Sequence, residues 1–198
     1  MGFGIFGAAL AAMLLGLGAS GDPPALRVDG EPVELVLRCR NHDGRWLLAA
    51  REQPATLMLF DAEHRLTKTW PVTSRNGQAV SRVAAIVDAT TRRSFVVALK
   101  DIAELWEISY DPKAEDFYDG LVHDFRMGEG VPTRGFLNPR RIPLIDPLET
   151  LRFDPVSTEV FGVSGVMLHW VNLDVRRRVA SRPLVDSQLT ELAAPPCR

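Results

Sequence analysis

Histidine is the residue type here that most readily transfers protons or binds metals near neutral pH, and the chain holds four of them. His123 stands out because the neighbouring Asp124 carboxylate can tune an imidazole and fix its tautomer. We therefore predict His123 as a metal ligand or a proton-transfer residue. Of the other three, two fall in expected turns, where solvated histidine is the ordinary outcome, and one in an expected strand. These are His42, His64 and His169.

Other patterns that carry chemistry are missing from the sequence. Cys39 and Cys197 belong to no C-x-x-C, zinc or C-x-x-C-H spacing, which argues against a disulfide framework and against covalently attached c-type haem. No H-E-x-x-H or G-x-S-x-G motif occurs, and the glycines of residues 128–130 fit no dinucleotide fingerprint. A net charge of −2, without a run of five or more like charges, makes nucleic acid an unexpected partner.

The chain begins with an apolar stretch, Phe3 to Gly18, that ends in the small residues of positions 19–21. This pattern is typical of a signal peptide, so we predict residues 1–21 as an export signal and a periplasmic location. About 16 apolar residues are few against the roughly 20 that span a bilayer as a helix. An uncleaved N-terminal anchor is the alternative, and it is the only membrane attachment that we expect.

Short strands separated by turn residues fill the rest of the chain, which predicts an all-β protein. In the first unit, a turn with Asp43-Gly44 at its centre precedes an inner strand at 46–50, and two further strands follow. Two more copies follow, each about 40 to 45 residues long, which is the size of a β-propeller blade. The expected strands are 46–50, 57–60 and 66–72, then 83–88, 94–99 and 104–110, then 152–154, 160–163 and 169–174.

Two segments do not fit the repeat. Residues 113–149 form an irregular stretch too long for an ordinary connection, so we expect it to be functional or disordered. Residues 183–198 diverge from the pattern that precedes them. The sequence is thus divided into a signal peptide or anchor (1–21), a partial propeller (22–182) and a divergent tail (183–198).

A family resemblance rests on the second unit. It contains the segments Ser81-Arg82-Val83-Ala84-Ala85-Ile86, Phe95-Val96-Val97-Ala98-Leu99-Lys100 and Glu104-Leu105-Trp106. These resemble the haem d1 domain of the cytochrome cd1 nitrite reductase family, and more closely the reductase-like proteins that help to make haem d1. The resemblance covers residues 41–179 and implies an eight-bladed propeller with the macrocycle near its axis.

Three to four blades are all that the candidate strands supply. An open arc leaves exposed sheet edges, which propellers normally remove by joining the first blade to the last. Two explanations remain open at this point. The chain is a truncated product, or a second chain completes the ring.

The resemblance also implies a site. Haem d1 carries several carboxylates, for which the planar fork of arginine is the preferred cation. Arg82 matches the strand motif, Arg51 falls in an inter-strand loop expected to face the axis, and the long stretch holds Arg126 and Arg134 besides Arg140 and Arg141. The iron needs an axial ligand, for which His123 is the candidate. The alternative for each arginine is an exposed ion pair with Asp or Glu.

Nitrite reduction is not expected of this chain. The resemblance places two proton-donating histidines near 148–154 and after residue 178, and this sequence has none there. The leading prediction is a periplasmic protein that binds haem d1 or a precursor non-covalently, for its biosynthesis or transfer in denitrification. One alternative is a cofactor-free propeller fragment that acts as an interaction module or is a relic. Another is an enzyme that oxidises the precursor, with His123 as its base.

Overall fold

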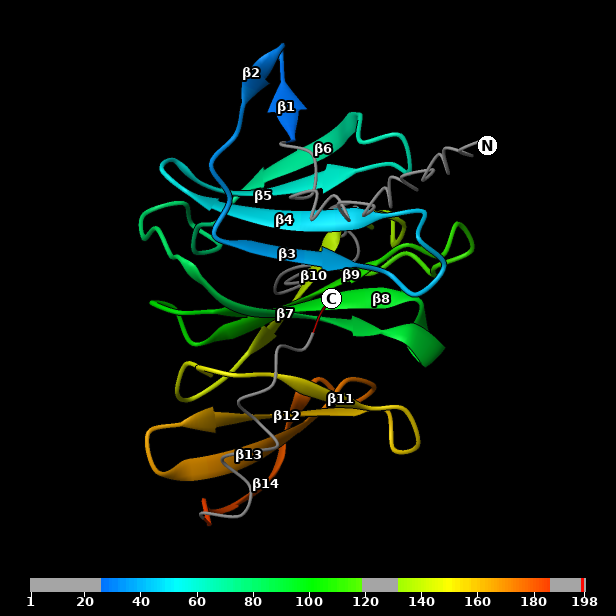
Figure 1. Ribbon diagram of the computed structural model, residues 1–198. Coiled ribbons are helices and arrows are strands. Elements are labelled where there is room, and N and C mark those ends of the chain that lie inside the picture. Colours follow the sequence, from blue (N-terminus) through cyan, green and yellow to red (C-terminus); the bar gives the residue numbers. More distant parts are fainter. Residues whose placement is uncertain (1–25, 119–131, 186–196, 198) are drawn as a thin grey trace, which may run out of the picture.

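Three four-stranded antiparallel sheets follow one another in the computed structural model, which describes residues 26–118, 132–185 and 197 (Figure 1). No helix in these residues has the length and apolar character needed to cross a membrane. A small hairpin, β1 (Arg27–Val28) and β2 (Glu31–Pro32), precedes the sheets, and a 3-10 turn spans Thr90–Arg92.

We number the three sheets as blades 1 to 3 in chain order. Blade 1 consists of β3 (Leu37–Arg40), β4 (Leu47–Glu52), β5 (Ala55–Phe60) and β6 (Leu66–Pro71). Blade 2 consists of β7 (Val83–Ala89), β8 (Ser94–Leu99), β9 (Glu104–Ser109) and β10 (Pro139–Pro143). Blade 3 consists of β11 (Arg152–Asp154), β12 (Glu159–Ser164), β13 (Met167–Asn172) and β14 (Arg177–Pro183).

The strands of each blade are paired in chain order, and the first strands of neighbouring blades contact each other. Strand β7 touches both β3 and β11, so these three are the inner strands and β6, β10 and β14 are the outer ones. This arrangement is that of propeller blades and confirms the predicted all-β fold class. The described residues form three blades in succession.

Two strand assignments made from the sequence need correction. The strand at 46–50, expected to be innermost, is the second strand of blade 1, because β3 lies inside it and pairs Leu37 with Ala50. The stretch 113–149, expected to be functional or disordered, supplies the outer strand of blade 2, since β10 pairs Arg141 with Trp106 of β9. The strand β10, Pro-Arg-Arg-Ile-Pro, was missed because it has no apolar alternation. The strand β3, Leu-Arg-Cys-Arg, does alternate, but over only four residues, which is a weak signal.

Turn chemistry explains the hairpins that the sequence did predict. Between β3 and β4, the Gly44 N–H donates to the Asn41 carbonyl at 3.0 Å, and Gly44 has φ +75°, which only glycine adopts easily. Between β5 and β6, one oxygen of the Asp61 carboxylate accepts the backbone N–H groups of Glu63 and Arg65. These local hydrogen bonds fix where each strand ends.

The core lies between the blades. Blades 1 and 2 bury one cluster that includes Leu59, Phe95 and Trp106, and blades 2 and 3 bury another that includes Ile142 and Val171. On its other side, blade 1 is covered by residues of the hairpin region, which pack on Met58 and Phe60. Because apolar side chains fill both interfaces, the blades are held at fixed positions and can support a site made from several of their loops.

A disulfide between Cys39 and Cys197 corrects the expectation drawn from the cysteine spacing. Cys39 lies on the inner strand β3 and is fully buried, and Cys197 packs partly buried against the core between blades 1 and 2. The two residues are 158 positions apart in the sequence, so no local motif could indicate the pair. The folding of three blades brings them together.

Candidate functional site

One end of the blades gathers the loops that carry two of the predicted arginines. Since each blade is an antiparallel meander, its second and third strands turn at the same end as the connections from one blade to the next. We call this end the connection face; it consists of residues 33–36, 51–55, 72–82, 99–103, 144–151 and 164–166, on the left of Figure 1. Arg51 and Arg82 both lie there.

Arg82 is held by Asp101. Its Nε and Nη2 donate to the two carboxylate oxygens at 3.0 and 2.7 Å, and its backbone N–H donates to Oδ2 at 2.9 Å. The predicted carboxylate-binding residue thus already has a carboxylate, supplied by the turn between β8 and β9. Its side chain stays 47% exposed, and a guanidinium has more donors than Asp101 uses.

The ion pair between Arg82 and Asp101 changes the pKa of Asp101, and this change can be measured. The hydrogen bonds from Arg82 lower the pKa of Asp101 from 3.8 to about 2. A carboxyl whose folded pKa is depressed contributes stability above its unfolded pKa and loses it as pH falls through the folded one, here between about pH 4 and pH 2. Solvent screens this half-exposed pair, so we expect the loss of stability over this range to be small. A carboxyl-carbon NMR titration checks the pKa. An Asp101 midpoint near 4 in the folded protein, or one unchanged by Arg82→Gln, would contradict the assignment.

Unlike Arg82, which is paired with Asp101, Arg51 lacks a partner for one of its donors in the described part of the chain. Its Nε is buried and has no hydrogen-bond partner among the described residues. It lies at the end of β4 and lines a hollow of about 420 Å³ together with Glu34, Glu52 and Gln53. A buried donor left without an acceptor costs free energy, so this guanidinium is prepared for an added acceptor.

The two arginines belong to neighbouring parts of the face. Asp101 is the main cause of a raised pKa of Arg82. The Glu52 carboxylate, next to Arg51 in the chain, also raises this pKa by electrostatic attraction, to a smaller extent. A second hollow of about 450 Å³ adjoins Asp101 and Lys100, and its far wall comes from blade 3. The connection face therefore offers two hollows beside cationic side chains, with acidic residues at both.

The other predicted site residues do not join this group. Arg134 is exposed in the connection between β9 and β10, at the opposite end of blade 2. His123 and Arg126 lie outside the described residues, so both stay predictions. Among the described residues there is no group of three His, Cys, Asp or Glu side chains placed to hold a metal.

The remaining histidines have protein partners. His42 Nδ1 lies 3.6 Å from Asp88, and His64 Nε2 lies 2.8 Å from Arg40 Nη2. His169 is buried on β13 with Nδ1 2.7 Å from the Ser181 hydroxyl. The turn histidines are paired rather than simply solvated, and His169 is the core residue that its strand position predicted.

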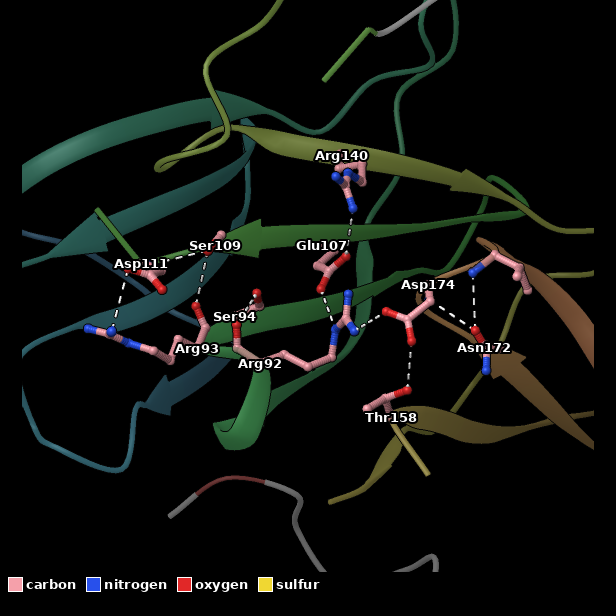
Figure 2. Close-up of polar contacts among 11 residues, drawn as sticks. Arg92, Arg93, Ser94, Glu107, Ser109, Asp111, Arg140, Thr158, Asn172 and Asp174 are labelled. Atoms are coloured by element: carbon pink, nitrogen blue, oxygen red, sulfur yellow. Dashed lines mark hydrogen bonds and ion pairs between the residues drawn. The ribbon is translucent and has the colours of Figure 1, made fainter. Parts of the chain in front are cut away.

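Sequence reasoning missed a polar network between blades 2 and 3 (Figure 2). Arg92 donates to Glu107 of β9 at 2.8 Å and to Asp174 of blade 3, whose other oxygen accepts from the Thr158 hydroxyl at 3.1 Å. Arg140 lies on the other side of Glu107 at 3.8 Å. No sequence motif joins these residues, because they come from five separate turns and strands.

Comparison with known proteins supports the fold and the family. Dihydro-heme d1 dehydrogenase of Pseudomonas aeruginosa is 36% identical to this chain over 145 residues, which are 72% of this chain and 25% of that protein. Residues 29–118 match the family model described as Cytochrome D1 heme domain. This part of the chain belongs to the cytochrome D1 heme domain family. The matched region contains blade 1, the first three strands of blade 2, and both Arg51 and Arg82.

Solved structures agree with the placement in the cytochrome D1 heme domain family. The structure titled dihydro-heme d1 dehydrogenase NirN in complex with DHE superposes with a TM-score of 0.60 at 32% identity, over 76% of this chain and 28% of that one. The WD40 repeats of RRP9 superpose with a TM-score of 0.53 at 11% identity, over 82% of this chain and 42% of that one, and show the propeller fold alone. The chain thus spans about a quarter of the length of the dehydrogenases that it matches.

Proposed function

We propose that the connection face binds haem d1 or a precursor of it without a covalent bond, through carboxylates of the macrocycle that reach Arg51 and Arg82. The protein would serve the biosynthesis or transfer of haem d1 and so act in denitrification. The observation that carries this proposal is that Arg51, whose buried Nε has no partner among the described residues, lines a hollow of about 420 Å³ at one end of the blades. The similarity to a protein named for dihydro-heme d1 supports the choice of ligand.

The two arginines would have different roles. Arg51 would gain its missing acceptor, and a charge-assisted bond of this kind contributes about 1.5–3 kcal/mol. The guanidinium donors of Arg82 would be divided between Asp101 and the ligand, so we expect Arg82 to contribute less binding free energy than Arg51. A tetrapyrrole also needs apolar contact, which Val83 and Ala84 at the edge of the second hollow can offer.

A periplasmic location is part of the proposal. The disulfide between Cys39 and Cys197 supports it, because such bonds persist in oxidising compartments and are rare in the reducing cytosol. The apolar N-terminal stretch supports it as an export signal or, in the alternative, as an anchor.

Nitrite reduction is not proposed, since the proton donors that the chemistry needs are missing from the two expected positions. Oxidation of a precursor would require His123 as the base. A second chain could complete the ring against blade 3, whose far side carries the stacked rings of Phe161 and Trp170.

A cofactor-free interaction module is the second candidate. The pairing of Arg82 with Asp101 favours it, because this ion pair needs no ligand. The two candidates differ in one measurable property, the binding of a macrocycle.

Titration with haem d1, followed by visible absorption while light scattering monitors aggregation, tests the proposal. We expect a saturable band with a defined stoichiometry. Arg51→Gln should weaken binding about 10-fold or more, since one charge-assisted bond is lost. Arg45→Gln is the matched control, because Arg45 is 74% exposed and lies in the turn between β3 and β4 at the opposite end. An absent band would favour the interaction module. Equal affinities of the two variants would overturn the role of Arg51 in binding.

A further inference from the structure

A third cavity lies far from the two hollows of the connection face, between the β8–β9 pair and the connection from β9 to β10. Its volume is about 190 Å³. Ser94 at the start of β8 and Ser109 at the end of β9 line it, which places it at the opposite end of blade 2. The other walls include Glu107, Phe117, Asn138 and Arg140.

Glu107 brings a carboxylate oxygen without a donor to this cavity. Its side chain is only 6% exposed, and Oε1 accepts from Arg92 Nε at 2.8 Å. Oε2 is buried and has no hydrogen-bond partner among the described residues. A charged oxygen in this position is expensive to leave unpaired, and native proteins rarely do so.

Arg140 brings the complementary group. Its Nη1 lies 3.8 Å from Glu107 Oε2, which is beyond hydrogen-bonding distance, and its guanidinium stacks on the Phe117 ring at 5.4 Å (Figure 2 shows Arg140 above Glu107). Ser94 also lines the cavity, and since its hydroxyl donates to the Arg92 carbonyl, its oxygen can still accept. The wall therefore presents two acceptors beside a cationic donor.

Part of the wall is built by close backbone packing. Phe117 and Thr133 exchange backbone hydrogen bonds at 2.9 and 2.8 Å, which joins the two described parts of the β9–β10 connection. At Gly135 a side chain would collide with the Glu115 carbonyl, so only glycine allows this approach. The cavity thus has a defined shape on the side of this connection.

We propose that this cavity binds a small zwitterion of the α-amino acid type. The ammonium donates to Glu107 Oε2 and the Ser94 hydroxyl, and the carboxylate accepts from Arg140. A simple anion would meet Glu107, and a metal ion would meet Arg140, whereas a zwitterion matches both charges. The volume corresponds to about six water-sized groups, which suits a short amino acid such as alanine. The site is independent of the haem d1 proposal.

Titration of the isotope-labelled full chain with L-alanine, followed by the amide NMR signals of Ser94 and Ser109, tests this site. N-acetyl-L-alanine lacks the ammonium and L-alanine methyl ester lacks the carboxylate, so each should bind at least 10-fold more weakly. Arg140→Leu should weaken L-alanine to a similar extent. Arg134→Leu is its matched control, because Arg134 is exposed in the same connection.

The ligand comparison needs only the natural sequence and remains decisive if the variant fails to fold. Saturable shifts with L-alanine that both derivatives lack support the zwitterion site. No saturable shift, or equal shifts with all three compounds, would overturn it.

Discussion

Glu107→Ala is expected to lower the free energy of unfolding by about 3–5 kcal/mol, as the removal of one partner from a buried ion pair does. Glu107 is buried on β9 between Arg92 and Arg140, and Arg92 is itself only 16% exposed. Without the carboxylate, Arg92 would keep a single acidic partner, Asp174 of blade 3. Urea denaturation followed by tryptophan fluorescence measures the change.

Glu63→Ala serves as the control for this prediction. Glu63 pairs with Arg65 at the surface and is 65% exposed, so its loss should cost less than about 1 kcal/mol. Glu107→Gln separates charge from hydrogen bonding, because the amide oxygen can still accept from Arg92. If Glu107→Ala unfolds at the same urea concentration as Glu63→Ala, the network between blades 2 and 3 does not stabilise the fold.

Removal of the disulfide is expected to have the next largest effect. A bond that closes a long loop restricts the unfolded chain, which contributes about 2–4 kcal/mol in typical proteins and up to about 5 kcal/mol for long loops. Here the loop spans 158 positions, so the upper part of that range applies. Cys39→Ala combined with Cys197→Ala should therefore lower Tm by several degrees.

The natural protein in dithiothreitol should show the same loss of stability, whereas the double variant should be indifferent to the reductant. Alanine is a suitable replacement at Cys39, because that position is fully buried among apolar side chains. Equal Tm values for the oxidised and reduced natural protein would show that the bond does not stabilise the blades.

The blades could be predicted where local chemistry determines them. The strands from Val83 to Tyr110 combine apolar runs with short turns, and β7, β8 and β9 lie where the sequence places them. Arg51, by contrast, was expected in an inter-strand loop and is instead the second-to-last residue of β4, where it pairs with Thr56 of β5. Strand β10 carries Pro139 and Pro143 at its ends and is recognisable as a strand only through its pairing with β9.

The partners of the charged residues could not be predicted in the same way. Arg82 was expected to meet a ligand carboxylate, and its nearest carboxylate is Asp101, 19 positions along the chain. Glu107 and Arg140 carry no pattern that tells an inward position on a blade from an outward one. Such pairs depend on how whole sheets are positioned, which a local spacing rule does not contain.

The bond between Cys39 and Cys197 also gives the molecule a cyclic topology. Residues 39–197 form one closed covalent ring. One cut by a protease anywhere within the ring opens it without releasing a fragment, and the two pieces remain a single molecule until the disulfide is reduced. A nick in an exposed turn within the ring therefore leaves all three blades covalently attached.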